Sequence, residues 1–223
     1  MIALIAAAAL AATQCPTAAT PAAGVCRALA AQQGGRFAEA AAEFEKAASL
    51  GRPGDPAVDR MLAAAGNMWI AAAEPSKAAL ALDKALAGTG LLADQRGLAL
   101  LDRARVAEMQ GDLKTARART DEALQSAAED PFAWYFSAAL AVRENDLKRA
   151  EAAIGRALTL APANADVLFE AGHIAQLGGD EARARGLFQR AIAADPNSAG
   201  GKAAKKALDL LAAPPAAASA TSR

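Results

Sequence analysis

The sequence predicts an all-α fold, an α-solenoid of stacked helix pairs, and three observations lead to this prediction. Alanine, the strongest helix former and a small side chain, accounts for 69 of the 223 residues. Aromatic residues make up only 4% of the chain, so a single large globular core would bury little area per residue. Alanines and larger apolar residues also recur at fixed steps along the chain. Together these features indicate close-packed helix pairs.

The charge balance and the cysteine count exclude several classes of protein. With 24 basic and 24 acidic side chains the formal charge is zero, so nucleic acid and anionic membranes find no bulk attraction. Two cysteines are too few for a disulfide-dense scaffold, and with a single histidine, His173, they do not make an ordinary zinc site. We therefore expect no metal, no cofactor and no nucleic-acid partner.

The first element is an apolar segment typical of a secretory leader. Residues 2–12 form an apolar run of eleven residues, shorter than the roughly 20 of a membrane span and within the roughly 7 to 15 of a signal peptide. Small residues follow at the cleavage point, but no Lys or Arg precedes the run, so an Ala-rich disordered leader is the alternative. We expect residues 1–20 to direct export to a bacterial periplasm, without stable membrane insertion.

Two alternatives stay open for the cysteines near this leader. Cys15 and Cys26 are eleven residues apart, and in an oxidising periplasm a disulfide would tie the leader to the first helix. The other interpretation is two unpaired thiols, one of them buried at a helix interface. A disulfide needs a Cα separation of about 4.4 to 6.8 Å, which the sequence does not supply.

A repeating helix-turn-helix pattern occupies the next part of the chain. Four turns align, at residues 35–37, 111–113, 145–147 and 179–181, and a fifth copy has Ala73–Pro75 in place of the turn. Each is followed by apolar residues in steps of four and three: Ala40, Phe44, Ala47; Ala78, Leu82, Ala85; Ala116, Thr120, Ala123; Ala150, Ile154, Ala157; Ala184, Phe188, Ala191. These steps lie on one helix face, where small residues admit the neighbouring helix and larger ones fill the gap.

In this pattern the chain resembles the tetratricopeptide repeat (TPR) family. That family repeats a unit of about 34 residues with a bulky position 4, small positions 8, 20 and 27, and a proline near 32. The copies here begin at Pro21, Asp59, Gly97, Pro131 and Ala165, at intervals of 38, 38, 34 and 34 residues, and the fourth matches best. We expect the four extra residues of the first two intervals in the loops near Arg52–Ala57 and Gly88–Leu92. The resemblance implies a right-handed α-solenoid of about five TPR units over residues 21–198.

The remaining C-terminal residues predict a cap and a tail. Residues 199–212 include an amphipathic segment, with Leu208 and Leu211 on one side and Lys202 and Lys206 on the other. A helix of this kind covers the apolar face that a solenoid leaves at its end. Residues 213–223 are small residues and prolines with too little apolar bulk to order themselves, so we expect a disordered tail.

The resemblance also implies a concave binding surface, lined by positions 2, 5, 9, 12 and 13 of the first helix of each unit. It assigns to a partner-binding groove Asn67, Arg105, Met109, Phe132, Tyr135, Arg143, Phe169, His173 and Gln176. Phe37, Phe44, Trp69, Trp134 and Phe188 fall at packing positions instead, and Phe136 is ambiguous. For Tyr135 and Phe169 the alternative is contact with the next repeat or the capping helix.

We expect an interaction scaffold for a protein or peptide, and no catalysis. An enzyme needs a nucleophile or metal beside an oriented base. Glu170 lies three residues before His173 on one helical face, but no serine, cysteine or metal-ligand set has helical spacing beside them. Of the residues with which chaperone-binding TPR domains hold a carboxylate, only Asn67 is present. The sequence thus predicts a scaffold in the periplasm or cell envelope, with a cytoplasmic adaptor that keeps its leader as the alternative and an enzyme as the second class.

Overall fold

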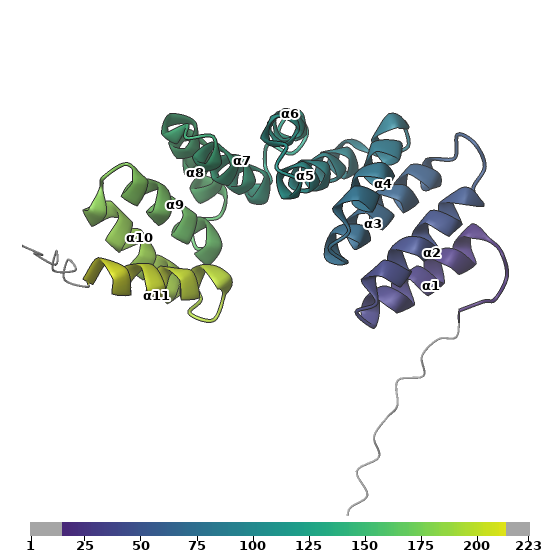
Figure 1. The fold of residues 1–223 in the computed structure, drawn as a ribbon, viewed down its shortest axis with the longest axis horizontal. Coiled ribbons are helices and arrows are strands. Elements are labelled where there is room, and N and C mark those ends of the chain that lie inside the picture. Colours follow the sequence, from purple (N-terminus) through teal and green to yellow (C-terminus); the bar gives the residue numbers. More distant parts are fainter. Residues whose placement is uncertain (1–14, 213–223) are drawn as a thin grey trace, which may run out of the picture. The chain divides into compact units, whose positions relative to one another are not determined.

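The computed structural model describes residues 15–212, and within this range the chain forms eleven α-helices and no strand (Figure 1). The all-α prediction is confirmed. Residues 1–14 of the predicted leader and the predicted tail at 213–223 lie outside the described residues. No helix of the described range is both long and apolar enough to cross a membrane. The chain divides into two compact units, residues 1–91 and 92–223, which are treated separately below.

Unit 1 contains two helix pairs that pack in sequence order. Its helices are α1 (Pro21–Gln33), α2 (Phe37–Ser49), α3 (Pro56–Ala71) and α4 (Pro75–Ala87). A proline opens α1, α3 and α4, where its missing N–H has no helical partner to lose. The side chains of Thr20 and Asp55 cap α1 and α3 by accepting a backbone N–H of the first turn.

Unit 2 contains three helix pairs and a final single helix. Its helices are α5 (Ala93–Met109), α6 (Leu113–Ala123), α7 (Pro131–Arg143), α8 (Leu147–Leu160), α9 (Ala165–Leu177), α10 (Glu181–Ala194) and α11 (Ala199–Ala212). Asp or Asn caps each helix from α6 to α10. The last helix packs against both α9 and α10, so it covers the end of the final pair.

Small residues bring the two helices of each pair into close contact. A Cβ added to Gly172 would lie 2.5 Å from the ring of Phe188, and one added to Gly66 would lie 2.5 Å from Cγ of Leu82. Alanine occupies the corresponding position of α7, where Ala138 has 0% exposure. Each large side chain thus fills the space above a small one, which is how an alanine-rich chain reaches a dense interior.

Every turn within a helix pair places one residue in the left-handed region. The φ angles are 71° at Gly35, 78° at Gly111, 84° at Gly179, 58° at Asn145 and 57° at Ala73. The sequence set Ala73–Pro75 apart from the other turns, but the structure gives it the same geometry. Ala73 therefore adopts a conformation that glycine and asparagine accept more easily.

The extra residues of the first two intervals lie mostly in helices, and their predicted place in the loops is wrong for most of them. Helices α3 and α5 have 16 and 17 residues, whereas α1, α7 and α9 have 13. They begin at Pro56 and Ala93, ahead of the expected starts at Asp59 and Gly97. The Asp55–Pro56 cap and the side chain of Gln95, which accepts the N–H of Leu92, start these helices early.

Candidate functional site

The predicted groove residues fall on the first helices of the repeats, and eight of the nine lie in unit 2. Asn67 is exposed on α3 of unit 1. In unit 2, Arg105 and Met109 lie on α5, Phe132, Tyr135 and Arg143 on α7, and Phe169, His173 and Gln176 on α9. None of these eight is fully buried. The candidate site is therefore described on unit 2.

Three aromatic rings form a cluster on α7. Phe132 is 43% exposed, and its ring centroid lies 6.1 Å from that of Tyr135 and 6.4 Å from that of Phe136. Phe136 is buried, so the residue that the sequence left ambiguous belongs to the core. Phe132 and Tyr135 remain partly open to solvent, and Phe132 exposes the larger fraction of its side chain. Together these two rings present an apolar surface that the rest of the described chain leaves partly uncovered.

A second group of rings lies on α9, beside α11. The ring of Phe169 stacks on His173 with a centroid distance of 6.4 Å and tilts against the buried Phe188 at 5.8 Å. Phe169, His173 and Gln176 line a pocket of about 270 Å³ whose other wall includes Lys206 and Leu210 of α11. Phe169 also packs against the core, and this contact accounts for part of its surface. The rest borders the pocket.

The two arginines of the predicted groove are paired within the chain. Arg143 at the end of α7 forms an ion pair with Glu108 of α5. Arg105 donates a hydrogen bond to Asp102 one turn earlier at 3.1 Å. Their charges are thus balanced locally, while Met109 on the same helix is 48% exposed. This end of the predicted groove offers apolar surface and neutralised ion pairs.

Glu170 is the residue that the sequence analysis underestimated. It lies on α9 between the two groove residues Phe169 and His173, and only 8% of it is exposed. Burial raises the pKa of its carboxyl, and the charge of His173 acts in the opposite direction. Within residues 15–212, no side chain or backbone group donates a hydrogen bond to this carboxyl or pairs with it. The sequence feature that could have pointed to Glu170 is an acidic residue at position 6 of a repeat unit, between two positions of the predicted groove.

The negative charge of Glu170 on α9 also acts on Tyr135 of α7. Burial raises the pKa of its hydroxyl most, and the charges of Glu170 and Asp166 raise it further. The charge of Glu170 thus acts on groups of two helices, the hydroxyl of Tyr135 on α7 and the imidazole of His173 on α9. The site therefore combines a buried acid with aromatic rings from two helices. Within the described range no three acidic, His or Cys residues are close enough to hold a metal ion.

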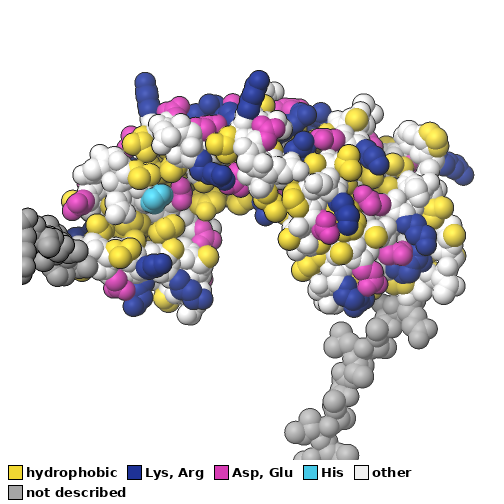
Figure 2. All heavy atoms as spheres, viewed as in Figure 1, with side chains coloured by type: hydrophobic (Ala, Val, Ile, Leu, Met, Phe, Trp, Pro, Cys, Tyr) yellow, Lys and Arg dark blue, Asp and Glu magenta, His cyan; other side chains and the backbone are white. Residues whose placement is uncertain are grey.

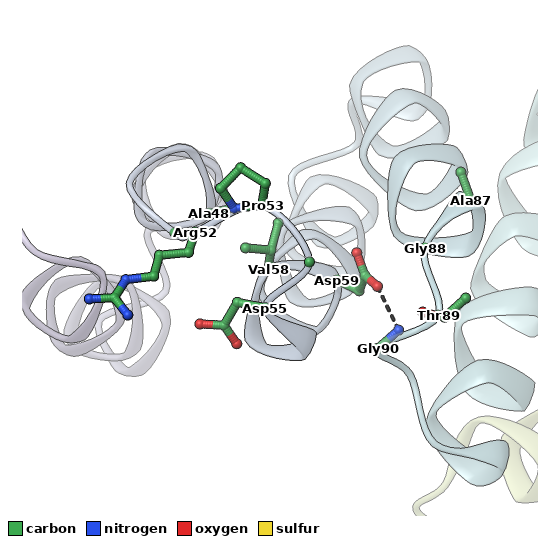
Figure 3. Close-up of a pocket in the computed structure, with 12 residues that line it drawn as sticks. Ala48, Arg52, Pro53, Asp55, Val58, Asp59, Ala87, Gly88, Thr89 and Gly90 are labelled. Atoms are coloured by element: carbon green, nitrogen blue, oxygen red, sulfur yellow. Dashed lines mark hydrogen bonds between the residues drawn. The ribbon is translucent and has the colours of Figure 1, made fainter.

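Unit 1 contains a polar pocket that is lined largely by two of its own loops. It has a volume of about 410 Å³ and lies between residues 51–55 and residues 87–90 (Figure 3). Asp59 accepts a hydrogen bond from the N–H of Gly90 at 2.7 Å, and Asp55 accepts one from Ala57 at the start of α3. Figure 3 shows the side chain of Arg52 directed away from Asp59. Both carboxylates thus accept hydrogen bonds from the chain's own backbone, and the bond between Gly90 and Asp59 stabilises the α4–α5 loop.

The described N-terminal residues are tied to α1. Cys15 and Cys26 form a disulfide in the structure, with their Cα atoms 5.6 Å apart. Arg27 donates a hydrogen bond to the carbonyl of Pro16 at 2.9 Å and pairs with Glu43 of α2 at 2.7 Å. The segment before α1 is thus held against the first helix pair by a covalent and a polar contact.

The sequence matches no protein-family model and no curated protein, whereas several solved structures share the architecture. YrrB, described as a TPR protein with an unusual peptide-binding site, matches with a TM-score of 0.61 and 19% identity over 82% of this chain and 91% of its own. PilW, a widely conserved type IV pilus biogenesis factor, matches with 0.67 and 20% over 82% and 81%. Pseudomonas aeruginosa PilF matches with 0.69 and 16% over 85% and 82%. At these identities the likeness is one of fold.

Proposed function

We propose that this chain, which has the tetratricopeptide-repeat fold, is a scaffold that binds a peptide segment of a partner protein on the first helices of unit 2. One observation carries the proposal: aromatic and apolar side chains are left uncovered on α7 and α9, whereas alanines fill the contacts between helices. Figure 2 shows hydrophobic side chains around the chain's one histidine. An apolar surface with a few polar groups is typical of a protein-binding site.

The proposed ligand is an extended peptide with apolar anchors. Phe132 and Tyr135 offer rings on α7, and the pocket between α9 and α11 offers a second place for an apolar side chain. His173 and Gln176 supply polar groups at its edge, which orient a ligand more than they add affinity. YrrB, which has the same fold, is described as having a peptide-binding site, and this supports a peptide as the ligand.

We propose further that the scaffold works in the periplasm or cell envelope. The 5.6 Å between the Cα atoms of Cys15 and Cys26 suits a disulfide, which persists in oxidising compartments. The role of PilW in pilus biogenesis is compatible with such a place. The intact mass of the protein from its native host tests this proposal. A cleaved chain that is lighter by two hydrogens supports it, and a full-length chain with two free thiols supports the cytoplasmic adaptor.

Binding by α7 is tested with peptides selected by display on the purified chain. The double variant Phe132→Ala with Tyr135→Ala removes the exposed rings of the α7 cluster, and we expect at least a tenfold loss of affinity by fluorescence anisotropy. Phe132 is not part of the core but Tyr135 packs against it, so the melting temperature should fall somewhat and affinity is compared well below it. Phe37→Ala is the matched control, since Phe37 is 36% exposed on α2 of the other unit. Unchanged affinity in the double variant would contradict the proposed groove.

A further inference from the structure

Glu170 is a buried acid whose carboxyl has no partner in the described part of the chain. At 8% exposure it is more than nine-tenths buried, and neither an arginine nor a lysine of residues 15–212 forms an ion pair with it. A buried carboxylate without a hydrogen bond is costly to the folded chain, so such groups are usually paired. Because no group of residues 15–212 forms an ion pair with it, this carboxylate is available to a cationic group of a ligand.

Aromatic rings border this acid on two helices. Phe169 and His173 stack on each other on α9, immediately before Glu170 and one turn after it. Tyr135 and Phe132 stack on each other on α7, and Tyr135 experiences the charge of Glu170. Aromatic faces attract cations, and arginine additionally stacks its planar guanidinium on them. Rings around a buried carboxylate are suited to a cation and unsuited to an anion.

The charge of His173 lowers the pKa of Glu170, but the other charged groups of residues 15–212 near the site form no ion pair with the acid. Arg143 is paired with Glu108, and Arg105 is hydrogen-bonded to Asp102. Asp166 adds a second negative charge, and one of its oxygens accepts the N–H of Gly200 at 2.6 Å. Lys206 of α11 lines the neighbouring pocket but forms no ion pair with Glu170 within the described range. The balance around Tyr135 is negative, which favours a cationic ligand.

We propose that Glu170 binds a basic side chain, arginine or lysine, of the partner peptide, held between the aromatic rings of α7 and α9. This inference rests on the proposed function, because it names the residue of the partner that this surface recognises. The carboxylate forms the ion pair with the incoming cation, and Tyr135 and Phe169 pack against its aliphatic stem and charged head. A partner segment with a basic residue next to an apolar one fits the acid and the neighbouring pocket together.

The chain offers unusually clean reporters for a direct test, since it contains one tyrosine and one histidine, and both lie at the site. The full chain labelled with 3-fluorotyrosine gives a single fluorine resonance, from Tyr135. We expect N-acetyl-arginine amide, and also N-acetyl-lysine amide, to shift this resonance and the ring protons of His173 in a saturable way. N-acetyl-citrulline amide has the shape of the arginine probe without its charge and should leave them in place.

Variants identify the acid responsible. Glu170→Gln keeps the side-chain shape and should weaken binding of the arginine probe at least tenfold. Glu181→Gln removes an exposed acid at the start of α10 and should leave binding unchanged. Equal shifts with arginine and citrulline probes, or unchanged affinity in a folded Glu170→Gln chain, would overturn the proposal. The citrulline comparison uses the unaltered chain, so it decides the question even if the variant unfolds.

The two proposals fail in different ways. If selected peptides bind through Phe132 and Tyr135 but keep their affinity when every arginine becomes citrulline and every lysine becomes norleucine, the role of Glu170 is wrong and the scaffold function stands. If the arginine probe binds but the double variant at α7 still binds every selected peptide equally well, the cation site stands and the peptide groove on α7 is wrong.

Discussion

Glu170 illustrates how a single buried side chain can oppose folding. Burial raises its pKa above the usual value of 4.5, so the folded chain binds this proton more tightly than the unfolded chain. The resulting stability is present below the unfolded pKa and is lost as the pH rises through the folded pKa. At neutral pH the group is therefore a charge that the fold would be more stable without.

The corresponding prediction concerns stability against pH. Glu170→Gln should have a higher free energy of unfolding than the unaltered chain near pH 7, and the difference should shrink as the pH falls toward about 4.5 and be small below it. Urea denaturation at both pH values measures it. Glu181→Gln, which removes an exposed acid, serves as the control and should differ little from the unaltered chain at either pH. A Gln variant that is less stable at neutral pH would mean that the carboxylate has a partner.

Gly172 and Gly155 give a matched pair of predictions on packing. A Cβ at Gly172 would lie 2.5 Å from the buried ring of Phe188, whereas a Cβ at Gly155 of α8 meets nothing within 4 Å. Gly172→Ala should therefore destabilise the chain by about 1 to 2 kcal/mol through overpacking, even after the gain in helix propensity. Gly155→Ala should stabilise it by up to about 1 kcal/mol. Thermal denaturation checks both signs, and two changes of the same sign would contradict the helix contact.

At the scale of elements, a polar seam joins the α5–α6 pair to the α7–α8 pair. Arg117 of α6 has a side chain only 11% exposed. It donates hydrogen bonds to both carboxylate oxygens of Glu144, at 2.7 Å for the shortest, and to the hydroxyl and carbonyl of Ser137. Arg149 of α8 pairs with Asp121 of α6 at 2.9 Å in a more exposed place. One arginine thus satisfies several groups that the seam would otherwise leave unpaired.

The seam predicts different costs for two similar substitutions. Arg117→Met leaves Glu144 and the buried Ser137 without their donor, and should destabilise unit 2 by about 1 to 3 kcal/mol. Arg149→Met removes an exposed ion pair and should cost less than about 1 kcal/mol. Chemical denaturation of both variants measures the difference. Equal costs would show that the bonds of Arg117 do not hold the two pairs together.

The same elements show which features of the fold can be read from the sequence. The positions of the turns, and the steps of Ala150, Ile154 and Ala157 after them, depend on contacts within one helix pair, so local spacing predicts them. The sequence did not predict the early starts of α3 and α5, because a capping side chain and a proline also occur in loops. The left-handed conformation of Ala73 was not predicted either, because alanine rarely adopts it and so gives no sequence signal for it.

The candidate site likewise has some features that the sequence predicts and others that it does not. The family register predicted that Phe132 and Met109 are exposed, because exposure follows from the face of a single helix. It did not predict that Arg143 is paired with Glu108, nor that Glu170 is buried and forms no ion pair with any group of residues 15–212. Those facts depend on which side chains a neighbouring helix brings close, and a pattern of small and large residues does not encode charges across helices.

For the whole molecule, the repeat pattern and the compact units describe different things. The pattern runs past residue 91 without a break, while the structure separates residues 1–91 from residues 92–223. A repeat records the contacts inside each pair of helices, and stability in repeat proteins also depends on the interfaces between neighbours. Spacing alone therefore says little about where a chain of repeats divides.

The matched small and large residues inside each pair have a consequence for how such a chain changes over generations. Gly172 is shaped for Phe188, and Gly66 for Leu82, and both partners of each match come from one copy of the repeat. A gene duplication or deletion of a whole copy carries its complete fit with it. A new copy can thus be inherited with its internal packing complete, so that selection acts mainly on its contacts with neighbouring copies and on its outward-facing residues.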